Sequence, residues 1–182
     1  MRELRIHGRG GQGSVTAAEL IATAAFTAGV YSQAFPAFGV ERRGAPVQAF
    51  VRFSDEKIRL RSQIYEPDYI IVQDSTLIRD VNVFAGMSEG GIAIINTEKD
   101  GAGYDLPKGV KLITIDATKV ALEEIGLPIT NTTLMGAFAA ASGEITLEAL
   151  EGAIKERFDA KLADSNIAAA KRAYAMVKEG RV

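Results

Sequence analysis

The chain has 182 residues, of which 47% are hydrophobic and 24% charged, and its formal net charge is −2. This is the composition of an ordinary globular protein, and the length predicts a single domain spanning residues 1–182. The small net charge gives no support for nucleic acid as the main partner, because proteins that bind phosphate backbones usually carry a basic surface.

The chain contains no cysteine and a single histidine, His7, which excludes several kinds of chemistry. Iron–sulfur clusters are held mostly by cysteine thiolates, structural zinc by cysteine and histidine, and thiol catalysis by a cysteine. None of these sites can be built from this chain alone. We expect His7 to be structural. The N-terminus lacks the apolar core of a signal peptide, and no apolar stretch reaches the about 18 residues of a membrane span. We therefore expect a cytoplasmic protein without membrane contact.

The first predicted elements are a strand over residues 3–7 and an alanine-rich helix over residues 14–28, joined by a glycine-rich loop. The helix carries one charge, Glu19, so we expect it to be buried against a sheet. Residues 31–46 follow without a sustained period. They combine aromatic residues, prolines and glycines with charged residues, which predicts an ordered loop with a functional role.

Alternation of apolar and polar residues next predicts an antiparallel hairpin. Its first strand covers residues 47–53 and its second strand residues 58–61, where Ile58 and Leu60 alternate with Arg59 and Arg61. For Arg59 and Arg61 the favoured interpretation is a solvent-exposed face.

Three short apolar runs, at residues 69–72, 92–95 and 112–115, are typical of strands buried on both faces of a parallel sheet. Each run ends in polar residues, which would lie at the carboxyl edge of the sheet, where open α/β sheets bind ligands. These residues are Gln73, Asp74, Ser75, Asn96 and Asp116. The C-terminal third has helical spacing, with Thr146 and Asp164 as predicted N-caps. The pattern predicts an α/β fold: a three-layer α/β/α sandwich with a mostly parallel, Rossmann-like sheet and an antiparallel hairpin.

The loop after the first strand reads Gly8-Arg9-Gly10-Gly11-Gln12-Gly13 and fits G-x-G-x-x-G between a strand and a helix. A dinucleotide site also needs an acidic residue about 20 positions later, yet no Asp or Glu occurs between Glu19 and Glu41. A Walker A loop fails because Ser14 stands where lysine is required. Two interpretations stay open: contact with an anion or cofactor, and a tight turn that serves packing only.

Two further groups of residues are candidates for binding. The basic residues Arg42 and Arg43 lie within a cluster that also includes Arg52, Lys57, Arg59 and Arg61. Guanidinium groups suit phosphates or carboxylates, so we expect Arg42 and Arg43 to bind a ligand or a partner, the alternative being a solvated face with Glu41 paired to a neighbouring arginine. Asn131 and Thr132 open a helix whose N-terminus could face an anion, although capping explains them equally well.

Several segments, in order along the whole chain, resemble the gamma subunit of the 2-oxoacid:ferredoxin oxidoreductase family, and of pyruvate:ferredoxin oxidoreductase in particular. The first two are IHGRGGQG at residues 6–13 and QAFPAFGVERRGAP at residues 33–46. The match continues through residues 59–68, 95–97, 115–118 and 131–138. Ser14 is a small departure, since an apolar residue is expected after the loop.

The resemblance implies a subunit of an enzyme that converts pyruvate, coenzyme A and oxidised ferredoxin to acetyl-CoA, CO2 and reduced ferredoxin. Thiamine diphosphate, Mg and 4Fe-4S clusters would belong to the partner subunits, which are the alpha, beta and delta chains, and ferredoxin would be contacted indirectly. The chain alone would then be inactive and would hold no cofactor of its own. For this chain, the resemblance implies a structural role and contact with coenzyme A, which is a substrate of the complex. The residues we carry over for that contact are Gly8, Gly10, Gly11, Gln12, Gly13, Arg42, Arg43, Asn131 and Thr132.

Two alternatives for the function stay open at this point, and one prediction concerns the isolated chain. A gamma subunit acting on branched-chain 2-oxoacids or on 2-oxoglutarate would look similar, because the substrate pocket lies elsewhere. A stand-alone nucleotide-binding module could use the same glycine loop. The aromatic residues Phe35 and Phe38, expected to be exposed, also predict self-association of the isolated chain.

Overall fold

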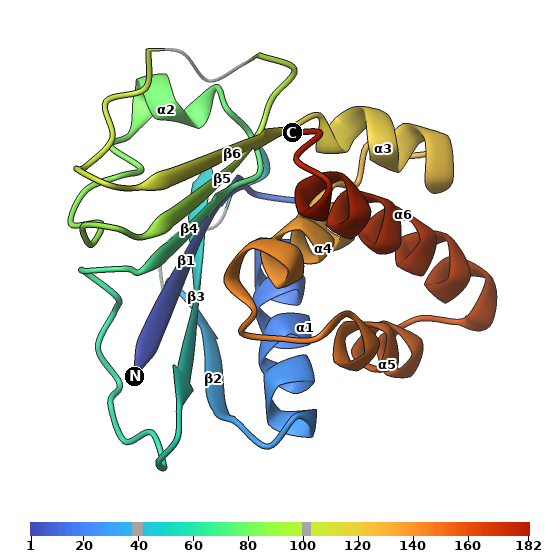
Figure 1. Ribbon diagram of the computed structural model, residues 1–182, viewed down its shortest axis with the longest axis horizontal. Coiled ribbons are helices and arrows are strands. Elements are labelled where there is room, and N and C mark those ends of the chain that lie inside the picture. Colours follow the sequence, from blue (N-terminus) through green and yellow to red (C-terminus); the bar gives the residue numbers. More distant parts are fainter. Residues whose placement is uncertain (38–41, 100–102) are drawn as a thin grey trace.

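The computed structural model describes residues 1–37, 42–99 and 103–182 and shows a six-stranded mixed sheet in the order β2-β3-β1-β4-β5-β6 (Figure 1). Strands β1, β4, β5 and β6 are parallel to one another, and β3 runs antiparallel to both β1 and β2. The strands are β1 (Arg2–Arg9), β2 (Tyr31–Pro36), β3 (Pro46–Ser54), β4 (Tyr69–Val72), β5 (Ile92–Asn96) and β6 (Lys111–Ile115). The predicted α/β class and the mostly parallel sheet are confirmed.

Helices flank the sheet on both sides, and the two outer layers differ in thickness. Figure 1 shows α1, α4, α5 and α6 together on one side of the sheet and the short α2 on the other. The helices are α1 (Ser14–Thr27), α2 (Leu77–Asp80), α3 (Ala117–Glu124), α4 (Asn131–Ser142), α5 (Leu147–Arg157) and α6 (Ala160–Lys178). Within the described ranges, no helix combines the length and apolar character needed to cross a membrane.

Alternate residues of the central strands face two separate cores. Ile71 and Ile94 belong to the larger core beneath the helices, together with buried residues of α1 and α4. Ile70 and Ile95 belong to a smaller core on the opposite face, closed by residues of the segment between β4 and β5. Both faces of these strands are therefore buried, which explains why they appear in the sequence as continuous apolar runs.

Helix α4 lies inside the helical layer rather than on its surface. Every residue from Asn131 to Ala140 is buried. Gly136 permits the close approach of α6, because a Cβ at this position would overlap the carbonyl oxygen of Ala170. This packing brings the first turn of α4 to the carboxyl edge of the sheet, beside the loop that follows β1.

Two predictions about the antiparallel part are wrong. Residues 31–46 were expected to form a loop, yet Tyr31–Pro36 is the edge strand β2. Residues 58–61 form no strand, although their alternation is that of one. The reason is topological: β3 already pairs with β1 along one edge and with β2 along the other, so no edge is left for a following strand. The antiparallel pairing of β3 is real, but its partners differ from the one predicted.

The capping predictions have mixed outcomes. Thr146 caps α5 as predicted, since its hydroxyl accepts a hydrogen bond from the N–H of Ala149 at 3.1 Å. The prediction for Asp164 is wrong, because α6 begins one turn earlier. Its cap is Asp159, whose carboxylate accepts from the N–H of Leu162 at 3.0 Å. Asp159 directly precedes the helix and can accept from its free N–H groups, whereas Asp164 lies inside the helix, beyond those groups.

Candidate functional site

The glycine loop between β1 and α1 uses its glycines for two different purposes. Gly11 and Gly13 have φ of +96° and +75°, a region that side chains with a Cβ rarely adopt. Gly8 and Gly10 instead permit close approach. A Cβ on Gly8 would overlap the side chains of Gln73 and Ser14, whose hydroxyl donates to Gln73 Oε1 at 2.5 Å.

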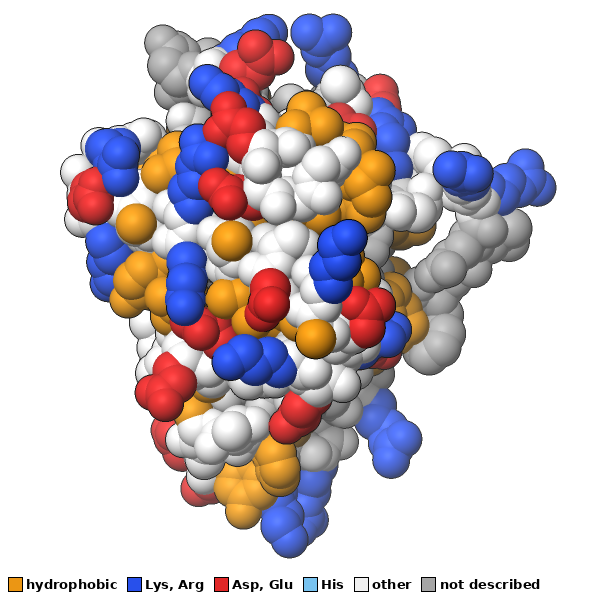
Figure 2. Space-filling model, turned by 90° about the vertical axis from the view of Figure 1, so that its right-hand side faces the viewer, with side chains coloured by type: hydrophobic (Ala, Val, Ile, Leu, Met, Phe, Trp, Pro, Cys, Tyr) orange, Lys and Arg blue, Asp and Glu red, His pale blue; other side chains and the backbone are white. Residues whose placement is uncertain are grey.

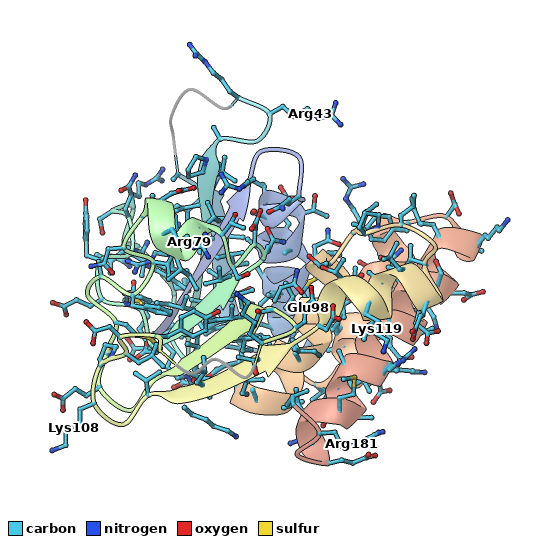
Figure 3. The ribbon with its side chains drawn as sticks, turned by 90° about the horizontal axis from the view of Figure 1, so that it is seen from above. Arg43, Arg79, Glu98, Lys108, Lys119 and Arg181 are labelled. Atoms are coloured by element: carbon cyan, nitrogen blue, oxygen red, sulfur yellow. The ribbon has the colours of Figure 1, made fainter. Side chains whose placement is uncertain are left out.

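The basic segment that begins at Arg42 returns directly onto this loop. The N–H of Gly10 donates to the carbonyl of Ala45 at 2.9 Å, and the N–H of Gly44 donates to the carbonyl of Gly10 at 3.0 Å. A Cβ on Gly10 would overlap the carbonyl oxygen of Arg42. Arg42 and Arg43 are exposed, and Figure 3 shows Arg43 pointing outward from this turn. The glycine loop and the Arg42–Ala45 turn, which are about 30 positions apart in the sequence, therefore form one structure.

Arg9, which no sequence pattern singles out, fixes the loop to its surroundings. Its guanidinium bonds the carboxylates of Asp74 at 3.0 Å and Asp80 at 2.8 Å. It also donates to the carbonyl of Gly44 at 3.2 Å. The hydrogen bond to Asp80 contributes most to raising the pKa of Arg9. Burial alone would raise the pKa of Asp74, but hydrogen bonds from Thr76 and Arg9 outweigh it and lower that pKa.

A cleft of about 810 Å³ opens beside the loop along the carboxyl ends of β4, β5 and β6. Its lining includes the polar residues predicted to meet at this edge: Gln73, Asp74, Ser75, Asn96 and Asp116. The side-chain amide of Asn96 donates to the carbonyl of Gln73 at 2.9 Å and to the hydroxyl of Thr118 at 3.0 Å. The floor of the cleft is therefore a connected set of amide and hydroxyl groups, with Gln12 of the glycine loop at one end.

Two helix N-termini converge at the loop end of this cleft. Gly13 is the N-cap of α1, and no side chain of the described residues caps that helix. An added Cβ on Gly13 would lie 2.6 Å from the side-chain nitrogen of Asn131, the first residue of α4. The positive ends of two helix dipoles thus meet at the glycine loop, which favours an anion there. Thr132 is oriented differently: its hydroxyl is buried and donates to Asn166 at 2.7 Å.

The outer part of the cleft carries mixed charge. Lys99 and Lys119 line it together with four carboxylates, those of Asp74, Glu98, Asp116 and Glu123. Glu98, which follows β5, and Lys119, on α3, line the same cleft with opposite charges (Figure 3). Asp116 is occupied as the cap of α3, since its carboxylate accepts from the N–H of Lys119 at 2.9 Å. Attraction for a polyanion must therefore come mainly from the glycine loop and the adjacent arginines.

Arg52 was counted in the basic cluster around Arg42 and Arg43, and its place in that cluster is wrong. Its side chain is 1% exposed and bonds Glu3 at 2.7 Å. The guanidinium also lies 5.0 Å from the centre of the Phe35 ring. The Arg52 side chain is thus buried, whereas Arg59 and Arg61 are exposed as expected and Lys57 is exposed too.

Phe35 is half-buried in β2, with its ring 5.1 Å from that of Phe50, so it is not the exposed loop residue that was expected. Phe38 and Glu41, on which the predictions of self-association and of a Glu41–arginine pair partly depend, lie outside the described residues. The prediction that His7 is structural is confirmed. His7 accepts a hydrogen bond from Arg5 Nε at 3.0 Å, and burial together with the charge of Arg5 lowers its pKa to about 3.

The donor set of the site is suited to binding. It consists of backbone N–H groups, amides, hydroxyls and two exposed arginines, which are the groups that hold phosphorylated ligands. In the part of the chain that the structure describes, no three His, Asp or Glu side chains gather as a metal site requires. Without cysteine, the residues of this chain do not fit an iron–sulfur cluster.

Comparison with known proteins places the chain in a family. The model of the pyruvate ferredoxin/flavodoxin oxidoreductase family matches residues 3–176. The chain is 59% identical over 155 residues to pyruvate synthase subunit PorC of Methanosarcina barkeri, covering 85% of each chain. It is 53% identical over 177 residues to the pyruvate/ketoisovalerate oxidoreductases common subunit gamma of Thermococcus kodakarensis, covering 96% of each.

A solved structure agrees with this assignment. The crystal structure of pyruvate oxidoreductase subunit PORC from Thermotoga maritima superimposes with a TM-score of 0.85 at 39% identity, covering 96% of this chain and 95% of that one. The glycine loop and the cleft beside it therefore stand in a fold shared with these subunits. The chain belongs to the pyruvate ferredoxin/flavodoxin oxidoreductase family.

Proposed function

We propose that the chain, as one domain over residues 1–182, is the gamma subunit of a pyruvate synthase complex in the cytoplasm. The complex would convert pyruvate, coenzyme A and oxidised ferredoxin to acetyl-CoA, CO2 and reduced ferredoxin. Support comes from relatives of nearly equal length that are named pyruvate synthase subunits, such as that of Methanosarcina barkeri. This function accounts for the family membership, for the absence of cysteine and for a cleft lined by groups suited to binding.

In this proposal the chain contributes no catalytic group. Thiamine diphosphate, with its Mg ion, and the 4Fe-4S clusters reside in the alpha, beta and delta subunits, and ferredoxin receives its electrons there. The lack of cysteine supports this division of labour, since the ligands of the clusters must come from other chains. The isolated chain is expected to catalyse no pyruvate-dependent electron transfer.

The glycine loop and its neighbours are proposed to hold the phosphates of coenzyme A. The single observation that carries this is the return of the Arg42–Ala45 turn onto Gly10 through two backbone hydrogen bonds. It places two exposed guanidinium groups beside a loop at which the N-termini of α1 and α4 converge. Gln12 and Asn131 would contribute polar contacts from the two sides of the loop. Thr132 would act indirectly, because its hydroxyl is bonded to Asn166 and its N–H donates to Asn131 Oδ1 at 2.8 Å.

The test compares the double variant Arg42→Ala/Arg43→Ala with a matched control, Lys155→Ala/Lys161→Ala, which removes two exposed cations from α5 and α6. In the reconstituted complex the arginine variant should raise the KM for coenzyme A by about tenfold or more, since two charge-assisted hydrogen bonds are lost. The KM for pyruvate should stay unchanged. The control should behave as the parent for both substrates.

Calorimetry on the isolated chain gives a second readout that does not depend on turnover. Coenzyme A should bind to the parent chain and to the control, and more weakly to the arginine variant. An unchanged affinity in the arginine variant would contradict the assignment of Arg42 and Arg43. Micromolar binding of NAD or ATP in place of coenzyme A would instead favour the stand-alone nucleotide-binding module.

A second candidate for the substrate is supported by one set of relatives. The Thermococcus kodakarensis protein is named as a subunit common to pyruvate and ketoisovalerate oxidoreductases. This chain would then serve two complexes with different partner subunits. An affinity-tagged chain should in that case recover two sets of partners from its native host, and the eluate should reduce viologen with either oxoacid. Recovery of a single set active on pyruvate alone would favour the first candidate.

A further inference from the structure

An arm formed by residues 57–66, between β3 and β4, stands apart from the site described above. It contains no helix or strand. Figure 1 shows it at the end of the sheet near the N-terminus, opposite the end where β1 leads into the glycine loop. A partner bound to this arm would leave the cleft free.

Two buried arginines hold the backbone of the arm by hydrogen bonds to its carbonyl groups. Arg52 donates to the carbonyl of Ser62 at 2.7 Å, and Arg5 reaches the carbonyl of Ile64 at 3.5 Å. Ile64 itself is 2% exposed. A Cβ on Gly86 would overlap the carbonyl oxygen of Tyr65, so the loop after α2 also packs directly against the arm. An irregular segment that is held in this way loses little further conformational freedom when a partner binds.

The side chains that the arm presents outward are those that dominate protein interfaces. Tyr65 is 69% exposed and Leu60 is 48% exposed. Three cations, Lys57, Arg59 and Arg61, lie on the same arm and are exposed, against one exposed carboxylate, that of Glu66. The ion pairs formed among residues 1–37, 42–99 and 103–182 include none of these three. Tyrosine and arginine are enriched among the residues that contribute most to binding energy.

We propose that this arm docks onto an acidic surface of another subunit of the same complex, with Tyr65 inserted between apolar groups and Arg59 and Arg61 facing carboxylates. The inference rests on the proposed function in taking the chain to be a subunit.

The charge of the arm favours an acidic partner subunit over a second copy of this chain. A symmetric contact with a second copy would bring together two arms that each carry an excess of positive charge, which is repulsive. The helical face shown in Figure 2 carries Lys, Arg, Asp and Glu interspersed, so it offers no comparable attraction for an acidic partner. The arm, with three exposed cations against one exposed carboxylate, fits an acidic neighbour better than that helical face does.

The proposal is tested by the assembly of the complex. The variants Arg59→Glu/Arg61→Glu and Tyr65→Ser are each co-expressed, as the affinity-tagged full chain, with the alpha, beta and delta subunits. Their matched controls are Lys155→Glu/Lys161→Glu and Phe26→Ser, the latter removing an aromatic ring that is 68% exposed on α1. Thermal unfolding of each isolated chain should match the parent, because all the replaced side chains are exposed.

Each arm variant should weaken the association by about tenfold or more, the size expected for loss of a central interface residue. The charge-reversal variant should also lose the salt dependence that the parent shows. Both controls should assemble as the parent does. Assembly of both arm variants within twofold of the parent would overturn the proposal.

A photo-reactive residue in place of Tyr65 identifies the occupant. Cross-linking to an acidic segment of the alpha, beta or delta subunit supports the proposal, and cross-linking to a second copy or to no subunit overturns it. Calorimetry of coenzyme A binding to the isolated arm variants separates this proposal from the proposed coenzyme A site. Loss of assembly with parental coenzyme A binding supports both proposals. Parental assembly with parental coenzyme A binding overturns only the docking of the arm.

Discussion

The substitution Gly10→Ala tests whether the glycine loop and the Arg42–Ala45 turn act as one structure. Gly10 has an ordinary φ, so the added methyl group costs no backbone strain. The methyl group would, however, overlap the carbonyl oxygen of Arg42. It would also lie 3.1 Å from the carbonyl carbon of Arg42 and 3.3 Å from the Cα of Arg43. The turn must therefore move away from the loop.

Moving the turn breaks the two hydrogen bonds that Gly10 makes with Ala45 and Gly44. Each is worth about 0.5–1.5 kcal/mol, so the turn should be released at a cost of about 1–3 kcal/mol. This free energy corresponds to an increase of roughly 5- to 160-fold in the population of the open turn. Global stability should change less, because the sheet and both cores keep their contacts.

The assay is limited tryptic cleavage after Arg42 and Arg43, which should accelerate in Gly10→Ala by about the same factor, since opening precedes cleavage. The affinity for coenzyme A should fall in parallel. The matched control is Gly11→Ala in the same loop, where no neighbour lies within 4 Å and the cost is strain at φ +96°, about 1–2 kcal/mol. Its cleavage at Arg42 and Arg43 should stay near the parental rate. Equal cleavage rates in Gly10→Ala and the parent would refute the reasoning.

Two further predictions concern stability. His7 has a pKa of about 3 in the folded chain, against about 6.5 when unfolded, so below pH 6.5 the unfolded state binds a proton that the folded state does not. The free energy of unfolding should therefore be highest above pH 6.5 and fall by up to about 5 kcal/mol towards pH 3. In urea unfolding, His7→Gln should show a smaller fall over this pH range. A fall as large as that of the parent would contradict the prediction. Gly136→Ala should destabilise by about 1–3 kcal/mol, because the methyl group meets the backbone of α6 at Ala170. Gly152→Ala, with open space around it on α5, should instead stabilise by about 0.5–1 kcal/mol; the same sign for both would refute the packing argument.

Strands whose apolar residues are buried in a core could be predicted from the sequence, including β6 at one edge of the sheet, whereas the other edge strand, β2, could not. The strands β4, β5 and β6 are continuous apolar runs because two cores cover them. The edge strand β2 has no comparable signal, since its residues are exposed or half-buried. Residues 58–61 alternate like a strand, yet pairing depends on a free edge of β3, which no local pattern reveals.

The residues of the site could be identified in part, but not their arrangement. The glycine loop and the polar residues that end the strands follow from local pattern and topology. The return of Arg42–Ala45 onto Gly10 is a contact between distant segments, and nothing in either segment predicts it. Arg9 was missed for the same reason: its partners Asp74 and Asp80 lie 65 and 71 positions away.

The most direct test of the proposed function is reconstitution of the complex with and without this chain. Pyruvate- and coenzyme A-dependent reduction of viologen should be absent for the chain alone, low for the alpha, beta and delta subunits alone, and restored when the chain is added. Turnover by the isolated chain, or full activity of the other subunits without it, would contradict the account.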